Sequence, residues 1–299
     1  MKVIISILGS GGDVHPFLAI GKGLKDRGHD VLMLSSEYYK EEIEKLPLRF
    51  KALNDIEAYN QFVYYSDPDK MPDAAPRQLE YLLTDPIKPT FDIITEEYEP
   101  GNTVLICWSW NPGIRIAQDK LHIPTVTIHL SPRSFQSYIK PPKLREKPIT
   151  RFTPQSEIKK LYDEVDTFLM TNSGKAINEF RIKLDLPPID SFLQWTESPD
   201  RIIGLFPEWF AKKQKDWPKQ TILTTFPLYG NKKGIVDDDI REFLKDGNIT
   251  IAVTPGTHFK HAKNIFYAAQ DAISELKIKG IFLTKYEEQV PKNLPETIL

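Results

Sequence analysis

The sequence predicts an α/β protein built on a parallel sheet, followed by the start of a second unit of the same kind. The first observation is residues 1–34, where a strand, a glycine-rich turn, a helix and another strand follow one another. The second is that apolar, strand-like runs alternate with helical patterns along the rest of the chain. The third is that a strand, a turn of small residues and a helix occur again within residues 249–284. Sheets of this kind bind ligands at the carboxyl ends of their strands.

Length and composition narrow the class of protein. The 299 residues are enough for about two domains, and 40% hydrophobic with 27% charged residues is typical of a protein with a true core. Lysine and arginine total 39 against 41 acidic residues, so no overall basic field favours nucleic acid. No apolar run approaches the roughly 18 residues of a membrane span, and the first is too short for a signal peptide. The single cysteine, Cys107, lies in an apolar run and is interpreted as a buried structural thiol. We therefore expect a cytoplasmic protein.

The first residues of the chain contain the signals that mark the bounds of a strand and a helix. Residues 3–8 are all apolar or small, as in a strand buried on both faces. Pro16 is predicted to open the following helix, and Gly28 stands just after its end. Residues 30–34 then form the second predicted strand.

The turn after the first strand projects two chemically versatile side chains, Asp13 and His15. A carboxylate at the start of a helix either caps free N–H groups and suits the helix dipole, or acts as a catalytic base. His15 is either a structural polar residue of the loop or a second candidate base. The turn lacks the dinucleotide fingerprint, because Val14 stands where the third glycine would be. Glu37, after the second strand, keeps a nicotinamide-dependent oxidoreductase open as an alternative.

Two insertions in the predicted sheet are distinctive. Residues 56–99, after a possible third strand at 48–53, are rich in tyrosine, proline and acidic residues. The tyrosines either line a ligand-binding pocket or form the apolar faces of ordinary helices. Residues 131–154 are interpreted as a solvated loop or as a surface attracted to an anionic membrane. The basic residues of this loop are Lys140, Lys143, Arg145, Lys147 and Arg151.

Aromatic and histidine side chains follow two further predicted strands, 103–108 and 123–128. Trp108 and Trp110 come at the end of the first, and His129 at the end of the second. Because the carboxyl ends of parallel strands share one edge, we expect these side chains near the turn that carries the acidic residue. A lone histidine after a strand is also commonly a hydrogen-bonded structural residue.

The last part of the chain is predicted to be a separate unit. A helix over 155–184 and a strand at 202–206 complete the first domain, residues 1–230, and residues 231–299 begin the second. The aromatic residues directly after that strand either pack or line a pocket.

A turn of small residues in the second unit has the chemistry of a phosphate-binding loop. The turn at residues 254–257 can present backbone N–H groups to phosphate oxygens. The acidic run at 237–239 is interpreted as a helix N-cap. His258 and His261 have no third ligand nearby in the sequence. No metal site is predicted.

Several segments together resemble one enzyme family. GGDVHPF (11–17) and GKGLKDRGHDV (21–31) are similar to the start of nucleotide-sugar glycosyltransferases of the UDP-glycosyltransferase type, families 1 and 28, which have two facing Rossmann-like domains, the GT-B fold. Within that group, the sequence resembles bacterial rhamnosyltransferase subunits of rhamnolipid synthesis, and then sterol and macrolide glycosyltransferases. Further segments with the same resemblance, in the same order, are 100–104, 115–121, 127–132, 198–200, 204–210, 216–218 and 254–257.

The resemblance implies an activity and a set of roles. The chain would take part in inverting, metal-independent transfer of a hexose from a nucleotide-diphosphate sugar to a hydroxyl of a lipid or other hydrophobic acceptor, with no cofactor beyond that donor. Asp13 would be the base, Gly11 and Gly12 would allow close approach, and Trp108, Trp110 and His129 would lie on the acceptor side. Thr254, Gly256, Thr257 and His258 would hold the donor diphosphate.

The sequence departs from the family pattern in two ways. Many members use a histidine base assisted by an aspartate, but Asp13 stands at the histidine's position and residues 108–111 contain no aspartate. The base is therefore open between Asp13 and His15. The family's His-Gly-Gly and acidic-Gln segments of the donor domain are also absent from the 299 residues, so a fragment or a shortened protein is expected.

Other functions stay open beside glycosyl transfer. The chain alone could be an acceptor-binding module without catalysis, or a nucleotide-sugar epimerase of related architecture. The expected partners are a nucleotide sugar and a hydrophobic or lipid acceptor, with peripheral contact at the inner face of a membrane as a further hypothesis. Nucleic acid is not expected.

Overall fold

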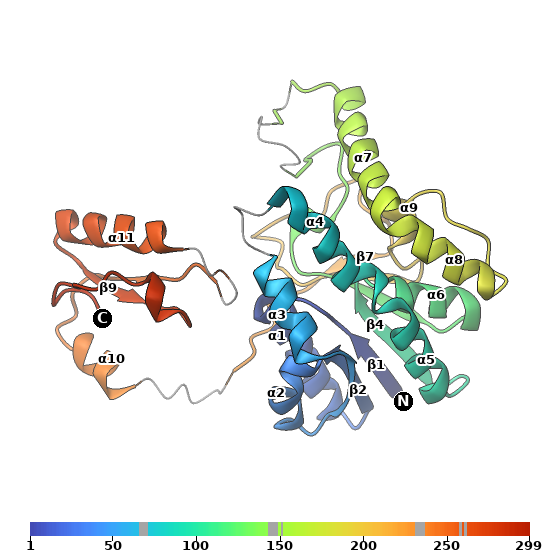
Figure 1. Cartoon of the computed structure of the whole chain (residues 1–299), viewed down its shortest axis with the longest axis horizontal. Coiled ribbons are helices and arrows are strands. Elements are labelled where there is room, and N and C mark those ends of the chain that lie inside the picture. Colours follow the sequence, from blue (N-terminus) through green and yellow to red (C-terminus); the bar gives the residue numbers. More distant parts are fainter. Residues whose placement is uncertain (66–70, 143–148, 151, 231–236, 257–258, 260–261) are drawn as a thin grey trace.

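A seven-stranded parallel sheet forms the largest part of the protein (Figure 1). The structure is a computed structural model that describes residues 1–65, 71–142, 149–150, 152–230, 237–256, 259 and 262–299. The strand order is β3-β2-β1-β4-β5-β6-β7, and a separate two-stranded parallel sheet, β8-β9, follows. The predicted fold class, a parallel α/β sheet followed by a second unit of the same kind, is confirmed.

The strands occur close to where the apolar runs predict them. Their bounds are β1 (Lys2–Ser6), β2 (Asp30–Ser36), β3 (Arg49–Asn54), β4 (Thr103–Trp108), β5 (Thr125–His129), β6 (Arg201–Gly204), β7 (Thr221–Leu223), β8 (Thr250–Val253) and β9 (Lys279–Phe282). The short edge strand β7 was not predicted, because three residues are too few to show a periodic pattern.

Helices connect and cover the strands. The α-helices are α1 (Gly11–Lys25), α2 (Lys40–Glu44), α3 (Ile56–Tyr64), α4 (Met71–Leu79), α5 (Ile87–Glu97), α6 (Pro112–Leu121), α7 (Gln155–Leu169), α8 (Lys175–Lys183), α9 (Phe192–Trp195), α10 (Asp238–Phe243) and α11 (Lys263–Leu276). Single π-helical turns are η3 (Glu80–Thr84) and η5 (Met170–Gly174), and the 3₁₀ turns are η1 (Glu37–Tyr39), η4 (Pro132–Ser134) and η6 (Glu287–Gln289). The helix predicted over 155–184 is thus two helices joined by the π-turn η5.

Helix α1 begins earlier than predicted. It starts at Gly11, with Ser10 as its N-cap, so Pro16 lies inside the helix and does not open it. Proline lacks an N–H, and the carbonyl of Gly12 therefore loses its helical partner. Gly12 is exposed, so water can take that place. The two glycines interpreted as a turn are in fact the first residues of the helix.

The core lies between the large sheet and its helices. Val3 to Ile5 of β1 and Val31 to Leu34 of β2 are at most 4% exposed, as expected for parallel strands covered on both faces. Phe17 and Leu18 of α1 are fully buried against them. Cys107 of β4 is also buried, which raises the pKa of its thiol to about 12. The predicted buried thiol is confirmed.

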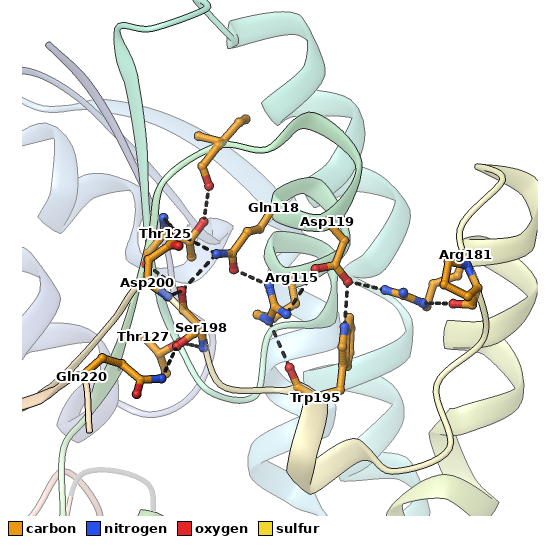
Figure 2. A network of polar contacts seen from close by, with 12 residues as sticks. Arg115, Gln118, Asp119, Thr125, Thr127, Arg181, Trp195, Ser198, Asp200 and Gln220 are labelled. Atoms are coloured by element: carbon orange, nitrogen blue, oxygen red, sulfur yellow. Dashed lines mark hydrogen bonds and ion pairs between the residues drawn. The ribbon is translucent and has the colours of Figure 1, made fainter. Parts of the chain in front are cut away.

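A buried polar network stabilises the amino-terminal edge of the sheet (Figure 2). Asp119, near the end of α6, accepts hydrogen bonds from Arg181 at 2.6 Å and from the indole N–H of Trp195 at 2.8 Å, and it pairs with Arg115 at 3.2 Å. Both arginines also stack over the Trp195 ring, at 5.5 and 5.1 Å from its centroid. Because every charge in this group has an oppositely charged or aromatic partner, the burial of the two arginines is compensated.

The second unit has a small core of its own. Gly280 of β9 lies so close to α11 that a Cβ there would stand 2.4 Å from the Ile273 Cδ1 atom. The end of the chain runs beside β9, where the N–H groups of Gly280 and Phe282 donate to the carbonyls of Thr297 and Leu299, each at 2.8 Å. In Figure 1, α11 and β9 lie apart from the seven-stranded sheet.

Candidate functional site

The candidate site lies where the chain leaves β1 and β4 at the carboxyl edge of the sheet. β1 pairs with β2 on one side and with β4 on the other, so α1 and α6 depart from neighbouring strand ends. The crevice between such departures is where open parallel sheets bind ligands.

Asn111 connects the end of β1 to the start of α6. Its side-chain amide donates to the hydroxyl of Ser6, at the end of β1, at 2.7 Å. Its side-chain oxygen accepts from the N–H of Ile114 at 3.1 Å and caps α6. Sequence reasoning did not select this residue, although an asparagine directly before Pro112 is a recognisable N-cap signal.

Asp13 lies in the first turn of α1 and points back towards the turn before it. Its Oδ2 atom accepts hydrogen bonds from the backbone N–H of Ser10 at 2.8 Å and from the Ser10 hydroxyl at 2.9 Å. Gly9 has φ +133°, and a Cβ there would stand 2.5 Å from Oδ2, so only glycine leaves room for this contact. The half-buried carboxylate therefore caps α1, as the first of the two interpretations expected.

His15 has different partners from Asp13. Its Nε2 atom lies 3.1 Å from a carboxylate oxygen of Glu42 in α2, and its ring stacks on Tyr229 at 5.0 Å between centroids. Burial, with the negative charge of Glu42 next, raises the pKa of Tyr229 to about 12. The contacts recorded for Asp13 and His15 therefore place them in two separate groups, although they stand two residues apart.

A cavity of about 440 Å³ opens beside His15. Residues that line it include Gly11, His15, Tyr38, Glu42, Tyr229 and Lys285. Its tyrosines are organised: Tyr38 stacks on Tyr59 at 4.0 Å, and the hydroxyls of Tyr39 and Tyr59 lie 3.1 Å apart. Burial raises the pKa of Tyr59 to about 12 and that of Tyr39 further, so both keep their protons at neutral pH.

The sequence did not predict that η1 and α2 line the cavity beside His15. Residues 37–46 have the charge pattern of a surface helix, and Tyr38 and Glu42 were not selected. Their position directly after β2 was the available signal, because every parallel strand ends at the same edge.

Trp108 and Trp110 lie at the expected edge but take part in packing. Their rings are nearly parallel at 5.8 Å between centroids, and Trp110 meets Phe192 edge-on at 6.3 Å. Both are half-buried against the main core. An additional contact with an acceptor stays a prediction.

His129 is buried at the end of β5. Its Nε2 atom lies 3.0 Å from a carboxylate oxygen of Glu197, and its ring meets Phe135 at 4.3 Å. The other ring nitrogen, Nδ1, has no hydrogen-bond partner among the described residues. This is the hydrogen-bonded structural histidine that was the alternative interpretation for this position.

The predicted donor-side turn is described only in part. Thr254 and Gly256 follow β8 and are exposed, and Gly256 has φ +110°. Thr257 and His258 lie outside the described residues. Of the acidic run, Asp237 is the N-cap residue of α10 and Asp238 its first residue, in the predicted position.

The described residues contain neither a metal-binding cluster nor a membrane-spanning helix. In that part of the chain, no three histidine, cysteine or acidic side chains are grouped closely enough to hold a metal ion. None of the described helices combines the length and apolar character needed to cross a bilayer.

Comparisons with known proteins relate the first part of the chain to glycosyltransferases. Residues 3–133 match the family described as the glycosyltransferase family 28 N-terminal domain. Among characterised proteins, O-mycaminosyltylonolide 6-deoxyallosyltransferase of Streptomyces fradiae is 21% identical over 265 residues, which are 86% of this chain and 61% of that protein. The chain thus spans about three fifths of that relative.

Solved glycosyltransferase structures share the fold. The calicheamicin glycosyltransferase CalG4 superposes with a TM-score of 0.63 at 11% identity, covering 99% of this chain and 68% of CalG4. SsfS6 of Streptomyces sp. SF2575, in complex with thymidine diphosphate, gives a TM-score of 0.59 at 12% identity, covering 98% and 70%. The fold is therefore that of the GT-B glycosyltransferases.

Proposed function

We propose that the protein is a glycosyltransferase that moves a sugar from a nucleotide-diphosphate donor to an acceptor hydroxyl. The observation that carries this proposal is the family match over residues 3–133, which include the β1–α1 turn and the ends of β4 and β5. The thymidine diphosphate bound to SsfS6, which has the same fold, supports a nucleotide-diphosphate donor. A lipid or another hydrophobic small molecule is our proposed acceptor. The resemblance to rhamnosyltransferase subunits makes an activated deoxyhexose the first donor to test.

The reaction requires one proton transfer at the acceptor. Its hydroxyl oxygen attacks the anomeric carbon from the face opposite the diphosphate, which leaves with the electron pair of the broken bond. The anomeric configuration is inverted, and a base at the crevice takes the hydroxyl proton. Backbone N–H groups of the turn after β8 would stabilise the charge on the departing diphosphate.

Asp13 is the first candidate for this base. The resemblance puts it in the family's base position, and it lies in the first turn of α1, directly after β1. The two hydrogen bonds from Ser10 fix the orientation of its carboxylate.

His15 is the second candidate, and one specific contact favours it. If its Nε2–H donates to Glu42, as the 3.1 Å separation allows, Nδ1 carries the lone pair that accepts a proton. The Glu42 carboxylate would then stabilise the imidazolium that forms, as in other histidine–carboxylate pairs.

Conservative variants of the complete protein distinguish the two bases. With Asp13 as base, Asp13→Asn lowers kcat by about 100-fold or more with little change in KM, and His15→Gln lowers kcat by less than about tenfold. The measurement is steady-state transfer of a radiolabelled sugar, and circular dichroism checks that each variant is folded. A large loss only in His15→Gln, with a pH profile shifted in Glu42→Gln, assigns the base to His15. Full activity in both variants contradicts this use of the crevice.

The other functions differ in what they bind and convert. An acceptor-binding module would bind the acceptor in calorimetry and would not bind a nucleotide sugar. An epimerase would convert the nucleotide sugar without any acceptor, which NMR of the donor would detect. Transfer that requires both substrates excludes each alternative.

A further inference from the structure

A second hydrophobic cluster, separate from the main core, includes Ile202 of β6, and Leu223 of β7 packs against it. Its buried members are Phe135, Ile202, Phe206 and Trp217, with Phe135 and Trp217 stacked at 4.0 Å. The cluster continues outwards, because the ring of Phe210 lies 6.4 Å from that of Phe206.

The outer end of this cluster is unusually exposed. Phe210 contacts Trp209 at 6.1 Å and Phe226 at 5.3 Å between ring centroids, and Trp209 contacts Phe226 at 6.0 Å. Trp209 is 79% exposed, Phe210 55% and Leu228 92%. We call Trp209, Phe210 and Phe226 the aromatic ridge; the exposed Leu228 follows Phe226 two residues later in the chain. Exposed apolar groups of this size that contact one another mark an interaction surface, whereas scattered single ones do not.

Positive charge borders the ridge. The four lysines of residues 207–220 are all exposed, and the segment has two acidic residues, although the whole chain has a net charge of −2. These lysines are Lys212, Lys213, Lys215 and Lys219. One of the two acids, Asp216, is already used: it accepts from the N–H groups of Tyr138 at 2.6 Å and Ile139 at 3.1 Å.

The contacts of Asp216 extend the surface. They hold the segment that contains exposed Ile139 and Lys140 next to the lysine-rich segment. This is the described beginning of the basic loop of the sequence analysis. Its other basic residues, Lys143, Arg145, Lys147 and Arg151, lie outside the described residues.

We propose that the aromatic ridge and its lysines dock the protein on an anionic lipid surface. Tryptophan and phenylalanine are favoured at the boundary between headgroups and acyl chains, and lysines interact with anionic headgroups while their stems cover apolar surface. Each lysine near such a surface raises the affinity by about fivefold at physiological salt. A second copy of the chain fits less well, because a two-fold contact through this face would bring the two lysine-rich segments together.

The test is sedimentation of the protein with vesicles. The wild-type chain is expected to bind vesicles that contain phosphatidylglycerol at least about tenfold more tightly than pure phosphatidylcholine vesicles, and 0.5 M salt should release it. Trp209 is the most exposed of the tryptophans, so its emission should shift to the blue on binding. Trp209→Phe should bind with a smaller shift, whereas Trp209→Asp combined with Lys212→Glu should lose at least about tenfold in affinity.

A matched control lies on α8, which has an exposed apolar residue next to an exposed lysine. Ile182→Asp combined with Lys183→Glu makes the same chemical change elsewhere and should bind vesicles like the wild type. Equal losses in the two double variants, or equal binding to neutral vesicles, overturns the proposal. So does a dimer in solution that only the Trp209 variant abolishes, because the ridge would then bind a second copy. The inference does not depend on the proposed enzymatic function, since none of these measurements requires turnover.

Discussion

At the scale of single residues, Asn111 shows how one side chain fixes the distance between two strand ends. It is only 4% exposed, and its side-chain amide N–H and oxygen bond to different elements: Ser6 at the end of β1 and Ile114 in α6. Alanine would leave the helix N-terminus and the Ser6 hydroxyl without partners in a buried place.

Asn111→Ala is therefore expected to lower the free energy of unfolding by about 1–3 kcal/mol. Urea denaturation followed by tryptophan fluorescence measures the change. Asn293→Ala, at an exposed position in the second unit, serves as the matched control and should stay within about 0.5 kcal/mol of wild type. A change of similar size in both variants would mean that the buried contacts of Asn111 contribute little.

The sequence could place Asp13 and His15 but could not identify their partners. A helix start and its acidic first turn are local features, so the capping role of Asp13 was among the predictions. Glu42 and Tyr229 reach His15 only through tertiary structure. Local pattern contains no information about which distant residue approaches a ring, so Glu42 and Tyr229 were not predicted as partners of His15.

At the scale of elements, one carboxylate at the end of α5, that of Glu97, forms ion pairs with residues of β1 and β3. Glu97, 9% exposed, accepts from Arg49 at the start of β3 at 2.6 Å, lies 3.1 Å from Lys51, and lies 3.3 Å from Lys2 at the start of β1. Burial alone would raise the pKa of Glu97. The hydrogen bonds from Arg49 and Lys51 and their charges outweigh it and lower the pKa from its usual 4.5 to about 2.

This shift predicts acid sensitivity with a definite sign. The Glu97 pKa is lower in the folded chain, so its contribution to stability is complete above about pH 4.5 and is lost as the pH falls towards 2. We expect about 1–3 kcal/mol, reduced by the solvent exposure of Arg49. Glu97→Gln should be less stable at pH 7 and should approach wild type near pH 2, in urea denaturation at each pH. Glu96→Gln, whose carboxylate is exposed, is the control, and the same pH dependence there would exclude this explanation.

Elements were predictable where burial on both faces requires a long run of apolar residues. The apolar runs of β1, β2 and β4 are covered on both faces, so they could be placed from composition alone. The predicted start of α1 at Pro16 was wrong. The helix begins at Gly11, because the contact of Asp13 with Ser10 caps it there, although glycines at such a position normally indicate a turn.

At the scale of the whole molecule, the two units differ in how much structure supports them. The large sheet has seven strands and a core that includes most of its helices, whereas β8 and β9 form a two-stranded sheet under one long helix. Isolated two-stranded sheets are marginal in water. The domain boundary near residue 230 was predicted from the sequence and stays a prediction.

The boundary can be tested by expressing the units separately. Residues 1–230 contain all five tryptophans and should keep a cooperative thermal transition in fluorescence and circular dichroism. Residues 231–299 alone should lack a cooperative transition. A stable, cooperative short segment, or an unfolded long one, would place the boundary or the source of stability elsewhere.

The position of β1 inside the sheet, between β2 and β4, determines the order in which the protein can be assembled during synthesis. Its first residue, Lys2, pairs with Asp30 on one side and with Thr103 on the other. β1 therefore stays apolar and half-paired until β4, about a hundred residues later in the chain, has been translated. Such delayed, long-range pairing makes folding slow and exposes apolar surface that is prone to aggregation. Slower translation before residue 103 would lengthen that exposure, so a nascent chain of this protein is a natural client for chaperones that bind apolar segments.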